Sequence, residues 1–199
     1  MELPRGKKTE RILRVLLNEP DGVLSKYKIA QNAKTSFSWV HEYLERLENL
    51  GFIEDTKVID FRALFDIWIE QRDGITKRKF VINDPMTLMS EVSLEYAFTT
   101  YQGENLVQGF LFPSRFDVYV KNKDYDDWID ILRNRGLMGS GNFNILIDDE
   151  HVFYNSKIID GFKVVSVPQL IVDLYKEGSV CAEAADNLMN SMVLQNVRK

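Results

Sequence analysis

The sequence predicts a mixed α+β protein in two parts: a mainly helical N-terminal part, and a larger part in which strands and helices alternate. Apolar residues recur at helical spacing through most of residues 9–50. After residue 94, short apolar runs bounded by turn residues indicate strands between helices. Asp84-Pro85 marks the boundary, because the residue before a proline is pushed away from helical backbone angles. We therefore expect one domain over residues 1–84 and another over residues 85–199.

The composition is that of an ordinary globular protein, with 45% hydrophobic and 28% charged residues. We see neither the roughly 18 apolar residues of a membrane span nor the apolar stretch of a secretory signal. The single cysteine, Cys181, cannot form an internal disulfide, which fits a reducing compartment. With His41 and His151 as the two histidines, a zinc site of the usual type is not expected. We expect a cytoplasmic protein with no metal, no cofactor and no membrane partner.

The charge is unevenly distributed. The net charge is −5, yet residues 1–41 hold eight lysines and arginines against four acids, a surplus of +4. Residues 85–199 hold 10 basic and 16 acidic residues, a balance of −6. The basic surplus therefore lies at the N-terminal end, where a nucleic-acid-binding module is most easily placed.

Three helices are predicted in the N-terminal part. The first covers residues 9–18, with Ile12, Leu13, Leu16 and Leu17 on one face and Arg11 and Arg14 off it. Ser25 stands at the N-cap position of the second, which runs to Ala33. The third spans residues 36–50, and Gly51 ends it. Its inward residues are predicted to be Phe37, Val40, Leu44 and Leu47.

Two strands are expected to follow, with a helix inserted between them. The first starts at Phe52-Ile53, residues 61–72 suit a packed helix, and residues 76–82 form the second strand. The basic run from Lys77 to Lys79 would lie at the tip of this hairpin, either beside phosphates or as a solvated loop.

This order of elements, and the stretch IAQNAKTSFSWVHEYLERLENLGFIE, resemble the winged helix-turn-helix family. The resemblance implies that residues 36–50 form a recognition helix that enters the major groove of double-stranded DNA. The outward residues of this helix would be Ser36, Ser38, Trp39, Glu42, Tyr43 and Arg46. Phosphate contacts would come from Lys26, Lys28, Lys34, Lys77, Arg78 and Lys79. A structural role competes with base contact for each outward residue: Ser36 could cap the helix, and Trp39 could cover the wing or a partner subunit.

The second part is expected to be α/β. Strands are predicted at residues 95–99, 116–121 and 158–166, and residues 139–155 are expected to give a glycine turn, a strand and a hairpin-like return. Helices are predicted at residues 86–93, 101–108, 125–135, 168–179 and 181–192. The segments FPSRFDVYV and KVVSVPQLIVDLYKEGSVCAEAADNLM are similar to the C-terminal domain of AbiEi-type antitoxin regulators of type IV toxin–antitoxin systems. This resemblance covers most of the chain. It implies a winged helix followed by a domain that is nucleotidyltransferase-like in fold but inactive. It also implies repression of a toxin operon, or neutralisation of a cognate nucleotidyltransferase toxin.

The residues around Asp117 distinguish an active enzyme from a regulator built on an enzyme-like domain. Active nucleotidyltransferases hold two metal ions with carboxylates two residues apart on one strand, helped by a third carboxylate on a neighbouring strand and a Gly-Ser pair before a helix. Here the partner position is Tyr119, the helix follows Thr99-Thr100, and Asp148 is the candidate third carboxylate. We therefore predict a catalytically degenerate domain with no catalytic residues. The alternative is an active metal-dependent nucleotidyltransferase that uses Asp117 and Asp148.

Arg115 and Asp117 could form an ion pair at a strand edge. They could also, with Asp148, form a residual pocket for a phosphate-containing ligand, with the Arg115 guanidinium as a forked donor. The sequence as a whole predicts a DNA-binding transcriptional regulator, specifically an antitoxin-type autorepressor. A winged helix that docks a protein is the further alternative. Symmetric operators would favour a homodimer, although no dimerisation seam is legible.

Overall fold

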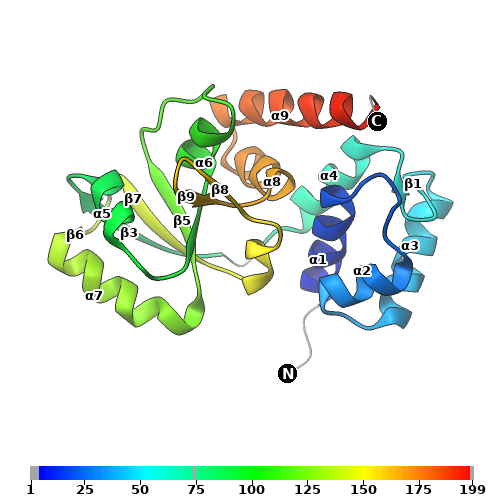
Figure 1. Ribbon diagram of the computed structural model, residues 1–199, viewed down its shortest axis with the longest axis horizontal. Coiled ribbons are helices and arrows are strands. Elements are labelled where there is room, and N and C mark those ends of the chain that lie inside the picture. Colours follow the sequence, from blue (N-terminus) through cyan, green and yellow to red (C-terminus); the bar gives the residue numbers. More distant parts are fainter. Residues whose placement is uncertain (1–4, 74, 198–199) are drawn as a thin grey trace. The chain divides into compact units, whose positions relative to one another are not determined.

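The computed structural model describes residues 5–73 and 75–197 of a mixed α/β protein (Figure 1). The chain divides into two units: the first comprises residues 1–73 and 187–199, and the second residues 74–186. The division precedes the boundary expected at Asp84-Pro85, because the strand before this dipeptide pairs within the second unit. No helix within the described part of the chain has the length and apolar character needed to cross a membrane.

The first unit begins with three helices and a short hairpin. Its elements are α1 (Arg5–Asn18), α2 (Lys26–Ala33), α3 (Phe37–Asn49), β1 (Ile53–Glu54), β2 (Lys57–Val58) and α4 (Phe61–Gln71). The Ser25 hydroxyl accepts a hydrogen bond from the Lys28 amide, which confirms the predicted N-cap of α2. The hairpin also pairs with the segment between α1 and α2, because the Val58 amide donates to Pro20 O at 2.8 Å.

Helix α1 is buried on more sides than its apolar stripe predicts. Ile12, Leu13, Leu16 and Leu17 are buried as expected, but Arg14, expected off this face, is buried too. The reason is that α1 packs against both α2 and α4. The Arg14 guanidinium lies over the indole of Trp68 in α4, at 5.0 Å from the ring centroid. Glu10 lies in the same buried layer and accepts a hydrogen bond of 2.7 Å from Arg72.

Helix α3 buries three of the four residues predicted to point inward. Val40, Leu44 and Leu47 are buried. Phe37, predicted inward, is 47% exposed and stacks on His41 with ring centroids 6.0 Å apart. Tyr27 of α2 flanks the same ring at 6.5 Å and is itself exposed. The buried stripe of α3 therefore begins at Val40, about one turn after Phe37.

The second unit is built on a seven-stranded sheet of order β6-β3-β7-β5-β4-β9-β8. The strands are β3 (Thr76–Ile82), β4 (Tyr96–Thr99), β5 (Phe116–Val120), β6 (Gly136–Met138), β7 (Phe143–Ile147), β8 (Lys157–Ile159) and β9 (Phe162–Val164). The helices are α5 (Pro85–Glu91), α6 (Thr100–Val107), α7 (Tyr125–Arg135) and α8 (Val167–Glu177), with the short turns η1 (Asn122–Asp124) and η2 (Glu150–Phe153). Helix α9 (Val180–Val197) has residues in both units.

Two strand predictions are wrong. Residues 76–82, expected to close the wing, form β3 and pair antiparallel with β6 and β7. The physical reason is that β2 already pairs with β1 across a two-residue turn, while Phe80 and Ile82 belong to the hydrophobic cluster of the large sheet. Residues 158–166, expected as one strand, form the β8–β9 hairpin because Asp160 and Gly161 adopt positive φ angles of 50° and 84°.

Two glycines allow β3 to be approached closely from its edge. A Cβ atom on Gly136 would lie 2.1 Å from Val81 O, and one on Gly141 would lie 2.1 Å from Phe80 O. Both positions therefore require glycine, since a side chain would displace the backbone of β3.

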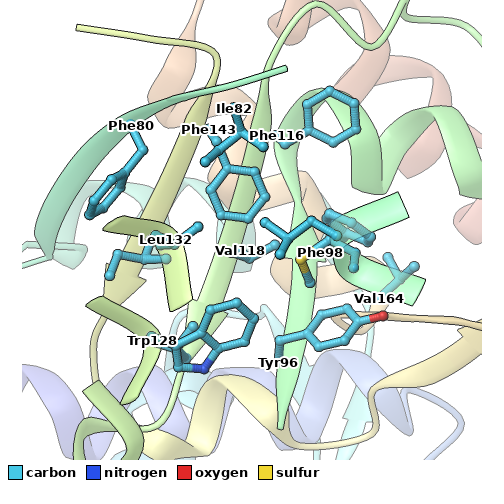
Figure 2. Close-up of a cluster of buried hydrophobic side chains, with 14 residues drawn as sticks. Phe80, Ile82, Tyr96, Phe98, Phe116, Val118, Trp128, Leu132, Phe143 and Val164 are labelled. Carbon is cyan, nitrogen blue, oxygen red and sulfur yellow. The ribbon is translucent and has the colours of Figure 1, made fainter. Parts of the chain in front are cut away.

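One face of the sheet carries a hydrophobic core, drawn in Figure 2. Phe98 of β4, Phe116 and Val118 of β5 and Phe143 of β7 lie side by side in it, and Trp128 of α7 packs against Tyr96 at one end of the cluster. Because side chains alternate along a strand, Asp117 and Tyr119 face the other side of β5. The sheet therefore sets the Asp117 carboxylate apart from the aromatic core.

Candidate functional site

Two places in the molecule hold the residues predicted to be functional. One is the surface of α2 and α3 in the first unit, and the other surrounds Asp117 in the second unit. Within residues 5–73 and 75–197, no group of three or more His, Cys, Asp or Glu side chains could hold a metal ion.

The start of α3 presents small polar groups to solvent. Ser36 and Ser38 are exposed, and the Ser36 side chain makes no capping hydrogen bond. Lys34, which ends α2 with a left-handed φ of 52°, is exposed as well. Lys28 is exposed, whereas Lys26 is half-buried and pairs with Asp55 at 3.3 Å. Lys34 and the two serines therefore lie at the junction of α2 and α3, and Lys28 follows Tyr27, whose ring is 6.5 Å from that of Phe37 at the start of α3.

The other outward residues predicted for α3 lie on a different flank of the helix. Trp39 and Tyr43 are half-buried, and Glu42 and Arg46 are exposed beside them. All four line a pocket together with residues from the start of α1 and the end of α4. The structure thus brings Trp39, Glu42, Tyr43 and Arg46 together around a pocket. They do not form the exposed row of groove-facing side chains that was predicted.

The basic run at residues 77–79 lies in strand β3 and not at a wing tip. Lys77 Nζ is 3.5 Å from Asp117 Oδ1. Arg78 Nε donates to the Tyr125 hydroxyl at 3.1 Å. Lys79 is exposed, and its carbonyl accepts a hydrogen bond from the Gly139 amide. The expected grouping of these residues with α3 depended on a wing strand that does not form.

Asp117 is buried, with 1% of its surface exposed, and its carboxylate is surrounded by donors. Asn144 Nδ2 donates to Oδ1 at 2.6 Å, and Lys77 Nζ lies near the same oxygen. The Thr100 hydroxyl and Arg115 Nε, the latter at 2.8 Å, donate to Oδ2. Each oxygen therefore has one neutral and one cationic neighbour, which is a stabilising environment for a buried carboxylate.

Arg115 connects Asp117 to α8. Its Nη1 donates to Glu177 Oε1 at 2.8 Å, and its Nη2 lies 2.7 Å from Oε2 as an ion pair. The guanidinium also lies 5.0 Å from the centroid of the Tyr101 ring. Burial opposes the positive charge, but the two carboxylates outweigh it and raise the pKa of Arg115 above its ordinary value. The hydrogen bonds from Arg115 lower the pKa of Glu177. The predicted Arg115–Asp117 ion pair is present, as part of a larger network.

Asp148 does not join this network. On the parallel strands β5 and β7, the residue opposite Asp117 is Asn144. Asp148 follows the end of β7, about 13 Å further along at roughly 3.3 Å per residue. It accepts a hydrogen bond from the Asp149 amide and does not line the Asp117 pocket. The prediction that Asp148 shares a site with Arg115 and Asp117 is therefore wrong, because the register places an amide at that level.

The turn from β4 into α6 uses two threonines. Thr99 donates its hydroxyl to Asp173 of α8 at 2.7 Å, and Thr100 donates its hydroxyl to Asp117. Thr100 has a positive φ of 46°, an unfavourable conformation for a β-branched residue. Both hydroxyls are thus engaged with carboxylates at the point where a glycine would turn without strain.

The space left around this network is small. A pocket of about 150 Å³ is lined by Lys77, Asp117, Tyr119, Asp173 and Glu177, among others. Pockets for drug-sized ligands usually measure about 300–1,000 Å³. The cavity therefore has room for a few water molecules or a small ion but not for a nucleoside triphosphate.

Sequence reasoning missed Asn144, Asp173 and Glu177. Asn144 is the single polar residue within the apolar strand FNILI, and this signal was available. Asp173 and Glu177 are one helical turn apart on α8, so they share a face. No local pattern places that face against β5, since the contact depends on the tertiary packing.

Comparison of the chain with models of known protein families, with curated proteins and with solved structures found no significant match.

Proposed function

We propose that the protein is a DNA-binding transcriptional regulator, in which residues 5–73 act as a winged helix-turn-helix. The observation that carries this proposal is the surface at the junction of α2 and α3. There, the exposed hydroxyls of Ser36 and Ser38 stand at the N-terminal end of α3, next to the exposed lysines 28 and 34. A recognition helix uses its N-terminal residues on base edges while neighbouring cations neutralise phosphates.

The hairpin supports the same proposal. Strands β1 and β2 follow α3 directly, and β2 also pairs with the segment before α2, through the Asp21–Lys57 bridge. A three-helix unit with a small sheet at this position is the arrangement expected of a winged helix. Since the hairpin turn contains Asp55 and Thr56, the wing would contribute little positive charge.

Acidic residues limit how α3 can approach DNA. Glu42, Glu45 and Glu48 are exposed on later turns of the helix. Only the first turn is therefore suited to the groove, and the later carboxylates would be repelled by phosphates. This gives a test in both directions, because removing a lysine should weaken binding and removing a glutamate should strengthen it.

The experiment is a fluorescence-anisotropy titration of duplex DNA from the protein's own promoter region over a range of salt concentrations. Lys34→Ala should weaken binding and reduce the salt slope by about one unit, as expected for one lost phosphate contact. Glu45→Gln should strengthen binding. Lys157→Ala, which removes an exposed lysine in the second unit, is the matched control and should change neither. If the wild-type protein fails to bind DNA even at low salt, the proposal is wrong.

We propose further that the second unit is a degenerate nucleotidyltransferase-like domain without activity. Tyr119 and Asn144 stand where such an enzyme needs carboxylates, and both hydroxyls of the Thr99-Thr100 turn are engaged by acids. Lys77 and Arg115 supply the positive charge that metal ions supply in an active site. The resemblance to AbiEi-type antitoxins then suggests repression of the protein's own toxin operon, or neutralisation of a nucleotidyltransferase toxin. Co-purification of a toxin encoded beside this protein would test that part.

A protein-docking role for the first unit is the second candidate. The observation that favours it is the exposed aromatic group formed by Tyr27, Phe37 and His41 beside the same polar surface. Aromatic side chains are enriched at protein interfaces. The Phe37→Ala variant distinguishes the two roles: a loss of partner binding that is insensitive to salt, with DNA affinity unchanged, would favour docking.

A further inference from the structure

The first unit contains a cavity of about 640 Å³, which is larger than the pocket beside Asp117. Trp39, Glu42, Tyr43 and Arg46 of α3 line it, with Thr9 from α1 and Gln71 from the end of α4. This volume lies within the usual range of small-molecule sites. The DNA contacts given under the proposed function, from Ser36, Ser38 and the exposed lysines, do not use these four side chains of α3.

The inner wall of the cavity is aromatic. Trp39, Tyr43 and Arg46 recur at intervals of four and three, so they lie along one flank of α3. Val40, Leu44 and Leu47, on the adjacent flank, are buried and hold the helix in place. Planar aromatic surfaces held by a rigid helix are suited to stacking against a flat ring.

The Tyr43 hydroxyl is shielded from solvent and has no hydrogen-bond partner among the residues that the structure describes. Burial raises the pKa of Tyr43 to about 12, so the group stays protonated at neutral pH. A buried hydroxyl without a hydrogen-bond partner is energetically unfavourable. A ligand with polar edges would remove this cost.

The rim of the cavity carries one negative and one positive group. Glu42 and Arg46 are exposed and one helical turn apart, yet neither forms an ion pair with another residue in the described ranges 5–73 and 75–197. A carboxylate and a guanidinium at this separation offer a hydrogen-bond acceptor next to a forked donor. In addition, the Lys8 ammonium lies 5.3 Å from the centroid of the Trp39 ring, which adds positive charge on this side of α3.

We propose that this cavity binds a guanine base. Guanine presents O6 and N7, which arginine contacts with two hydrogen bonds, and beside them an N1–H and an amino group that a carboxylate accepts. Arg46 and Glu42 take these two roles, Trp39 or Tyr43 stacks on the ring, and Lys8 attracts an attached phosphate. Adenine offers no acceptor in the place of O6 and no N1–H. The base comes from a free guanine nucleotide or from an unpaired guanine in a nucleic acid.

The test uses the full chain and the fluorescence of Trp39. Trp68 and Trp128 are fully buried, so quenching by an added ligand reports on Trp39. Titration with GMP should quench the emission to saturation, while AMP should bind at least about tenfold more weakly, as one lost paired contact implies. An oligonucleotide with a single unpaired guanine, compared with the same strand carrying adenine, identifies the source of the base. Calorimetry with GMP gives a second readout that does not depend on tryptophan.

Variants at the rim make the test specific. Glu42→Gln and Arg46→Gln change exposed residues, so both proteins should fold, and each should reduce GMP affinity at least about tenfold. Glu54→Gln, an exposed substitution on β1, is the control and should bind GMP like the wild type. Equal binding of GMP and AMP, no saturable binding of either guanine ligand, or rim variants that bind GMP normally would overturn the proposal. Because no duplex DNA is present, these outcomes are independent of whether the first unit binds an operator.

Discussion

Asn144 lies directly opposite Asp117 on the neighbouring parallel strand and donates its side-chain amide to that carboxylate at 2.6 Å. A metal site at this level of the sheet would need oxygen ligands turned toward Asp117, whereas Asn144 presents its NH2 group there and position 119 is tyrosine. Instead, the amide and the cations of Lys77 and Arg115 satisfy Asp117 from within the protein. The arrangement stabilises the buried carboxylate, because both of its oxygens receive donors from the protein itself.

The first prediction separates the structural role of Asp117 from a catalytic one. Asp117→Asn leaves Arg115 and Lys77 without their shared partner and should lower the free energy of unfolding by about 3 kcal/mol. This loss of stability is at the low end of the range for breaking a buried ion pair, because the side chains of Lys77 and Arg115 are partly exposed to solvent. Urea denaturation measures the loss. Asp148→Asn is the matched control and should cost much less, since Asp148 lies outside the network. Metal-dependent nucleotide transfer that disappears in both variants, without loss of stability, would instead identify an enzyme.

The second prediction concerns the buried charges of the first unit. Glu10 accepts from Arg72 at 2.7 Å and lies near Arg14 and the Trp68 indole, all of them buried. Glu10→Gln should cost about 3–5 kcal/mol, because two buried guanidinium groups lose their counter-charge. Glu19→Gln, at an exposed position after α1, should change stability by less than about 0.5 kcal/mol. Chemical denaturation followed by tryptophan fluorescence checks both, and similar midpoints for the two variants would contradict the prediction.

The third prediction is a dependence of stability on pH. Hydrogen bonds from Arg115 lower the pKa of Glu177 below its ordinary value of 4.5. A carboxyl whose pKa is lowered by folding stabilises the native state above its unfolded pKa, and this contribution is lost as the pH falls through the folded value. Thermal unfolding should therefore show falling stability below about pH 4.5, and Glu177→Gln should lose less of its stability over that interval.

Glu95 adds a second loss of stability at low pH, because hydrogen bonds from Lys121 and Lys163 lower its pKa. The Glu177→Gln variant keeps this contribution. Glu183→Gln, exposed on α9, serves as the control. Identical pH profiles for the wild type and Glu177→Gln would show that the Arg115–Glu177 contact contributes nothing to stability.

The fourth prediction tests the close approach of the β6–β7 turn to β3. Gly141→Ala places a methyl group 2.1 Å from Phe80 O and should cost at least about 1–3 kcal/mol. Gly6→Ala meets nothing within 4 Å and lies inside α1, so it should be neutral or stabilise by up to about 1 kcal/mol. Differential scanning calorimetry on both variants provides the comparison. A Gly141→Ala protein as stable as the wild type would mean that the edge of β3 moves away easily.

The sequence by itself determined the helices of the first unit and the three middle strands β7, β5 and β4 of the sheet. Val40, Leu44 and Leu47 define α3, Ser25 caps α2, and the run Phe116–Val120 is a strand. These features depend on local spacing and on the chemistry of caps and turns, which a single sequence records directly. The sequence also shows directly that position 119 is tyrosine and not a carboxylate.

Only the tertiary structure decided which strands and side chains meet. Strand β3 could have extended the hairpin, but the burial of Phe80 and Ile82 places it in the seven-stranded sheet. The register of β5 on β7 puts Asn144 opposite Asp117 and leaves Asp148 too far along. Packing of α4 on α1 buries Arg14, and the cavity at Trp39 and Tyr43 depends on helices far apart in sequence. Each of these outcomes follows from long-range pairing and burial, whose free energy depends on the whole fold and not on any local pattern.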